Sequence, residues 1–153
     1  MGTGSGAYKL VLFLHILTVV VGIGGVMLNG VYAAKARKAG GPAAGAIMQA
    51  NFDVTMVAEK FIYAIPIFGI ALVGMSDDAW AFSQTWVWLS LVLYVLAMGI
   101  SHGVMIPNGK KMLAGPSGPE EAEALGKKLA MGGMSLDLLA VVLIALMIWK
   151  PGA

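Results

Sequence analysis

Long hydrophobic runs separated by short polar segments dominate the chain. The first run extends from Tyr8 to Ala34 and holds no charged side chain between Lys9 and Lys35. A helix of about 20 such residues spans the hydrocarbon core of a bilayer. Three more runs of this kind follow, so the pattern predicts four membrane-spanning helices, at approximately 8–34, 53–75, 82–106 and 129–149. The segments between them are predicted to be loops, apart from a short surface helix that begins at Pro119.

Two prolines modify this pattern. Pro66 lies in the middle of the second run and predicts a kink there, because proline removes one helix hydrogen bond. Pro107 is followed by Asn108 and Gly109, and these three residues predict the end of the third helix.

Small and polar residues of the first run fall on one side of its predicted helix. Steps of three or four residues from His15 lead to Thr18, Gly22, Gly25 and Asn29. Residues at this spacing share a helix face, and small residues allow neighbouring helices to approach closely. The stripe is therefore predicted to face the other helices of a bundle, while the apolar faces contact lipid.

Composition agrees with this interpretation. Of the 153 residues, 59% are hydrophobic and only 12% are charged, which excludes an ordinary soluble domain. The predicted fold class is all-α, a polytopic membrane protein with a four-transmembrane-helix bundle in a single domain, 1–153. The lack of cysteine excludes disulfides, zinc–thiolate sites and iron–sulfur clusters. The expected partners are the lipid bilayer and either further copies of the chain or a larger membrane complex, and no nucleic acid.

The basic residues predict the orientation. Those that follow the first and third runs are Lys35, Arg37, Lys38, Lys110, Lys111, Lys127 and Lys128. Since basic loops stay in the cytoplasm, both termini are predicted to be non-cytoplasmic in a multi-pass protein of the cell (inner) membrane. A cleavable signal peptide within residues 1–36 is the alternative, although the apolar run is longer than such a peptide needs.

His15 is the first candidate for chemistry, because an ionisable residue inside a spanning helix marks a functional site by default. A neutral imidazole can ligate haem or relay protons, and the alternative is a hydrogen bond that packs two helices together. His102 is the only other histidine. The two are predicted to differ in depth by more than about 10 Å, so they cannot bind one metal atom together.

Two further groups lie in the predicted inner half of the membrane. Met98, His102 and Met105 share a face of the third helix and form a weak candidate site for Cu(I), since thioethers and imidazole suit that ion. Methionine also fills irregular gaps in apolar interiors, which is the alternative. The second group is a polar cluster of Glu59, Lys60, His102 and Asp137. It predicts either structural ion pairs or a cavity for protons or a small polar ligand.

One segment resembles a known group of proteins. Leu14-His15-Ile16-Leu17, then Gly22-Ile23-Gly24-Gly25 and a basic segment, are similar to the first helix of small bacterial four-helix membrane proteins. That group includes uncharacterised proteins of this size, copper-resistance D-type domains and the haem-carrying membrane protoporphyrinogen oxidase. The resemblance implies a four-helix membrane fold, and the oxidase branch implies haem, with His15 as its axial ligand.

These observations predict a small integral membrane protein without deciding whether it is an enzyme. The leading hypothesis is a cofactor-binding subunit, with haem at His15, or an accessory subunit of a membrane complex. The alternatives are an enzyme of the protoporphyrinogen-oxidase type, or a small carrier that uses the polar inner-half cluster.

Overall fold

The computed structural model describes residues 2–153. The helical segments are α1 (Gly6–Met27), α2 (Asn29–Ala39), α3 (Gly41–Gly74), α4 (Thr85–Ile100), the π-helical turn η1 (Ser101–Met105), α5 (Ile106–Ala114) and α6 (Pro119–Trp149). They combine into four rods of 34, 34, 30 and 31 residues, each long and apolar enough to cross a membrane. The predicted fold class, an all-α bundle with four spanning helices, is thereby confirmed.

The helices extend further than the apolar runs predict. At about 1.5 Å per residue, each rod measures about 45–50 Å, against a hydrocarbon core of about 30 Å. The basic segment after the first run is helical as α2, and α3 begins at Gly41 instead of near residue 53. The short surface helix predicted at Pro119 joins the fourth spanning helix to form α6. Proline in the first turn does not break a helix, because the amide it lacks would have no partner there.

The third rod does not end at Pro107 as the sequence predicts. It passes through η1 and continues as α5 to Ala114. Within the π-helical turn the Ile106 N–H donates to the Ser101 carbonyl oxygen, five residues back. This local change in hydrogen bonding accommodates Pro107, which has no N–H, and the helix therefore continues beyond it.

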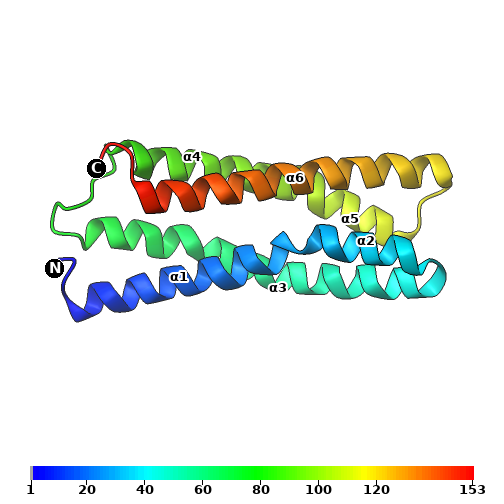
Figure 1. Ribbon diagram of the computed structural model, residues 1–153, viewed down its shortest axis with the longest axis horizontal. Helices are drawn as coiled ribbons and strands as arrows, with labels where there is room; N and C mark the ends of the chain where they lie inside the picture. Colours follow the sequence, from blue (N-terminus) through cyan, green and yellow to red (C-terminus); the bar gives the residue numbers. More distant parts are fainter. Residues whose placement is uncertain (1) are drawn as a thin grey trace.

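The rods form two hairpins that lie side by side (Figure 1). The first pairs α1 and α2 with α3, and the second pairs α4, η1 and α5 with α6. Both termini and the α3–α4 connection lie at one end of the bundle, and the α2–α3 and α5–α6 turns lie at the other (Figure 1). The basic residues of α2, α5 and early α6 therefore gather at the same end.

Aromatic and polar contacts hold the segments together at the end of the bundle where the termini lie. The Trp80 indole N–H donates to the Tyr8 hydroxyl at 3.0 Å. The Trp80 and Trp86 rings meet edge to face, with 5.5 Å between centroids. The Lys150 Nζ lies 3.9 Å from the Trp80 ring centroid, which is the geometry of a cation–π contact. These contacts join the start of α1, the α3–α4 connection and the end of α6.

Candidate functional site

A buried carboxylate lies at the centre of the molecule. Glu59 is on α3 and its side chain is only 5% exposed. The Ser101 hydroxyl donates to Glu59 Oε1 at 3.2 Å, and His102 Nε2 lies 3.6 Å from the same oxygen. A buried carboxylate inside a spanning helix is costly unless polar groups surround it. Here those groups come from the other hairpin, so Glu59 links the two halves of the bundle.

His102 lies between this buried carboxylate and the surface of the protein. Its side chain is 48% exposed. Nδ1 lies 3.0 Å from the Met98 carbonyl oxygen, and Nε2 lies 2.8 Å from the Tyr63 hydroxyl. In the tautomer with a proton on Nδ1, the ring donates to Met98 and accepts from Tyr63. We call Glu59, Tyr63, Ser101 and His102 the Glu59–His102 cluster.

The π-helical turn explains why Ser101 and His102 reach α3 together. A π turn inserts one extra residue into a helix and changes the direction of the side chains that follow, and such turns often occur at functional sites. Two side chains near the turn also contact backbone carbonyls one turn earlier. His102 Nδ1 contacts the Met98 carbonyl oxygen, and the Asn108 amide donates to the Val104 carbonyl oxygen at 2.6 Å.

Sequence reasoning named two of these four residues and missed Tyr63 and Ser101. Tyr63 follows Glu59 by four residues, a spacing that places both on one helix face, so this signal was present in the sequence. Ser101 is adjacent to His102, but neighbours on an α-helix point about 100° apart. Only the π-helical turn brings both to the same carboxylate.

Lys60 and Asp137, the other members of the predicted polar cluster, form no salt bridge with it among the described residues. In the described chain the pairs within salt-bridge distance are Glu59 with His102 and Glu123 with Lys127. Lys60 is exposed, and Asp137 is partly exposed on α6. Lys60 follows Glu59 directly, so the helix turns its side chain outward, and a long lysine stem can carry its charge toward the membrane surface.

Two of the three candidate copper ligands, His102 and Met105, contact different neighbours. The His102 ring faces Tyr63 of α3. Met105 lies instead against α6, where its Sδ is 2.7 Å from the position that a Cβ on Gly132 would occupy. Because η1 widens the helix between these residues, His102 and Met105 contact different neighbours. Met98 contributes its backbone carbonyl to His102.

His15 lies between α1 and α3 and is 8% exposed. Its Nδ1 lies 3.1 Å from the Ile65 carbonyl oxygen, and its Cε1 is 3.2 Å from the position of a Cβ on Gly69. His15 thus contacts α3 at Ile65 and Gly69, whereas His102 contacts it at Glu59 and Tyr63.

The stripe below His15 lies along α3. Thr18 donates to the His15 carbonyl at 2.8 Å, and Gly22 is buried. A Cβ on Gly25 would lie 2.8 Å from the Ala58 Cβ. At the end of the stripe, Thr55 donates to the Asn29 side-chain oxygen at 3.2 Å. Gly22 and Gly25 thus place α1 close to α3 beside Ala58, the residue before Glu59, and Asn29 joins the start of α2 to α3.

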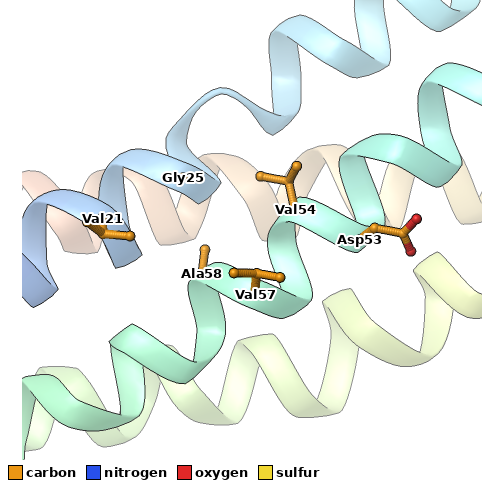
Figure 2. A pocket seen from close by; sticks show the side chains of 6 residues that line it. All are labelled: Val21, Gly25, Asp53, Val54, Val57 and Ala58. Carbon is orange, nitrogen blue, oxygen red and sulfur yellow. The ribbon is translucent and has the colours of Figure 1, made fainter.

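An apolar groove follows the same contact where α1 ends (Figure 2). It is lined by Val21, Gly25, Asp53, Val54, Val57 and Ala58. Val54 and Val57 are more than half exposed, and Asp53 points away from the valines (Figure 2). Its oxygen accepts from Gln49 at 2.8 Å. The groove thus offers apolar surface and no convergent polar groups, unlike the Glu59–His102 cluster.

Comparison with known proteins supports the membrane interpretation. Residues 9–151 match the family described as "Predicted integral membrane protein (DUF2269)". No curated protein and no solved structure matches the chain. The match agrees with the predicted resemblance to uncharacterised membrane proteins and with a multi-pass protein in a lipid bilayer. The resemblances to copper-resistance D-type domains and to the oxidase stay predictions.

Proposed function

The chain belongs to the DUF2269 family of predicted integral membrane proteins, and we propose that it is a small carrier that moves protons through the Glu59–His102 cluster. One observation carries the proposal, which is a buried Glu59 carboxylate 3.6 Å from the Nε2 of a half-exposed histidine. Intramembrane carboxylates and histidines that contact each other are typical of proton relays. Histidine is suited to this role, because its ordinary pKa lies near neutral pH.

The geometry defines two arrangements of the cluster. With neutral His102, Tyr63 donates to Nε2 and Ser101 donates to Glu59. A proton that arrives at Nε2 of the half-exposed ring makes this nitrogen a donor, and the Tyr63 hydroxyl must then rotate to accept. The imidazolium faces the Glu59 carboxylate, and transfer of the proton to Oε1 yields a neutral acid and restores the neutral ring. The side chain of His102 is 48% exposed and that of Glu59 is 5% exposed. In this proposal the histidine therefore accepts the proton from solvent, and the buried carboxylate then holds it.

Proton flux in proteoliposomes tests this proposal. Purified protein is placed in vesicles that contain a pH-sensitive dye, and a potassium diffusion potential is applied. We expect the lumen to acidify with wild type and with Lys60→Gln, because Lys60 is exposed and outside the cluster. We expect no acidification above that of empty vesicles with Glu59→Gln. Equal flux in wild type and Glu59→Gln, or no flux in wild type, would overturn the proposal.

The second candidate function is haem binding at His15, which the resemblance to the oxidase implies. The contact between Nδ1 and the Ile65 carbonyl oxygen favours it. Histidines that ligate metals usually donate their other ring N–H in this way, which leaves the Nε2 lone pair for iron. Against it stands the burial of His15, which is 8% exposed and packed against Gly69.

The absorption spectrum of the purified protein tests haem binding. We compare wild type with His15→Ala and His102→Ala, each at matched expression. Loss of a Soret band only in the His15 variant supports the ligand role. An equal spectrum in wild type and His15→Ala assigns His15 to helix packing alone.

We also propose that the basic end of the bundle is cytoplasmic and that both termini are on the other side of the inner membrane. The support is the positive-inside rule together with the common location of the α2–α3 and α5–α6 turns (Figure 1). A reporter that is active only outside the cytoplasm should be active after Ala153 and inactive when inserted at Gly40. The reverse pattern contradicts this orientation.

A further inference from the structure

The turn of α3 before Pro66 has an unusual hydrogen-bond arrangement. Pro66 lies inside α3 and has no N–H, so the carbonyl of Ile62 loses the donor that an α-helix normally provides four residues later. An unsatisfied carbonyl in the interior of a membrane protein costs free energy. The hydroxyl of Tyr94, on α4, donates to this oxygen at 3.3 Å. Tyr94 therefore replaces the missing amide from across the hairpin boundary.

A second side chain contacts the same turn from α1, the partner of α3 in the first hairpin. His15 of α1 reaches the carbonyl of Ile65, the residue directly before the proline. The turn before Pro66 is thus contacted from α1 by His15 and from α4 by Tyr94. Of the two, only Tyr94 meets a carbonyl that has lost its helical donor.

The turn before Pro66 is adjacent in the chain to the Glu59–His102 cluster. Ile62 precedes Tyr63 in the chain, and Glu59 lies one turn earlier on α3. The titratable groups around Glu59 are His102 of η1, whose Nε2 lies 3.6 Å from the Glu59 oxygen, Tyr63, one turn further along α3, and Tyr94 of α4, whose hydroxyl contacts Ile62 in that turn. A small change in the direction of α3 at Ile62 therefore changes the distances between Glu59 and its partners.

We propose that Tyr94 is a positioning residue for the Glu59–His102 cluster, which it acts on through the Ile62 carbonyl that Pro66 leaves free. The inference rests on the proposed role of Glu59 in proton transfer. It adds a residue that the sequence pattern does not indicate. It also assigns a role to Pro66, whose missing N–H leaves the Ile62 carbonyl to Tyr94.

A double-mutant cycle tests this inference. The variants are Tyr94→Phe, Pro66→Ala and the double variant, with Tyr32→Phe as the matched control, because Tyr32 is an exposed tyrosine of α2. The readout is the pH midpoint at which the infrared carboxyl band of Glu59 changes, with the band identified by its loss in Glu59→Gln. Infrared titration in nanodiscs does not depend on transport.

We expect Tyr94→Phe to move the midpoint by up to about 1 pH unit, because only the part of one hydrogen bond's free energy that differs between the two protonation states of Glu59 contributes to the shift. In the Pro66→Ala background the same substitution should move it by less than about 0.2 unit, because the backbone N–H restored by Pro66→Ala then donates to the Ile62 carbonyl. Tyr32→Phe should have no effect. Equal shifts in both backgrounds, or no shift with Tyr94→Phe, would overturn the inference. Absence of proton flux in wild type, with the expected cycle intact, would instead refute the carrier and keep Tyr94 as the residue that positions Glu59.

Discussion

Gly22 provides the most direct test of how the two helices of the first hairpin are held together. A Cβ at this position would lie 2.9 Å from Ile62 Cγ1, 3.0 Å from the Ile62 backbone nitrogen and 3.4 Å from the Ala58 carbonyl oxygen. The isoleucine side chain can rotate, but the backbone nitrogen cannot move alone. Gly22→Ala therefore forces α1 away from α3 by about 0.5 Å, the distance needed to reach an ordinary contact.

This displacement determines the expected magnitude. Overpacking of a close-packed contact costs about 1–3 kcal/mol. Gly24→Ala is the matched control, because a Cβ there has nothing within 4 Å. Glycine to alanine in a helix otherwise stabilises by up to about 1 kcal/mol. Because this gain applies to both variants, they should differ in free energy of unfolding by the overpacking cost, about 1–3 kcal/mol.

Reversible unfolding in mixed micelles, followed by tryptophan fluorescence, measures this difference. Gly22→Ala should unfold at a lower denaturant fraction than wild type, and Gly24→Ala at an equal or higher one. If Gly22→Ala proves as stable as Gly24→Ala, then α1 and α3 are not packed in the way described and the position of Glu59 loses its support.

Two further predictions concern other contacts of the bundle. Gly132→Ala should cost less than about 1 kcal/mol in the same unfolding assay, because its new Cβ meets the flexible thioether of Met105; a larger loss would show that Met105 cannot move. Lys150→Met should lower the free energy of unfolding by about 1 kcal/mol and alter tryptophan emission, since it removes the ammonium above the Trp80 and Trp86 rings; an unchanged unfolding curve would mean that this contact adds nothing.

The sequence was sufficient for the architecture, because a bilayer imposes one requirement on every spanning segment. Backbone groups in lipid must be paired within the chain, so an apolar run of about 20 residues has to be a helix. The number of helices and the side of α1 that packs depend on composition and on the spacing from His15 alone. The ends of the helices were less predictable, since polar helical residues beyond the membrane have no apolar signal. The extension through Pro107 depended on a local shift to π-helical hydrogen bonding.

The candidate site required the tertiary structure. Sequence reasoning grouped Glu59, Lys60, His102 and Asp137 by depth, and depth does not specify direction around a helix. Packing of the two hairpins brought Glu59 to His102 and left Lys60 and Asp137 without a salt-bridge partner among the described residues. Tyr94, whose hydroxyl donates to the Ile62 carbonyl, is 32 residues away from it in the chain. Such contacts form between helices whose rotation is fixed by packing against each other, and no periodicity within one helix encodes that rotation.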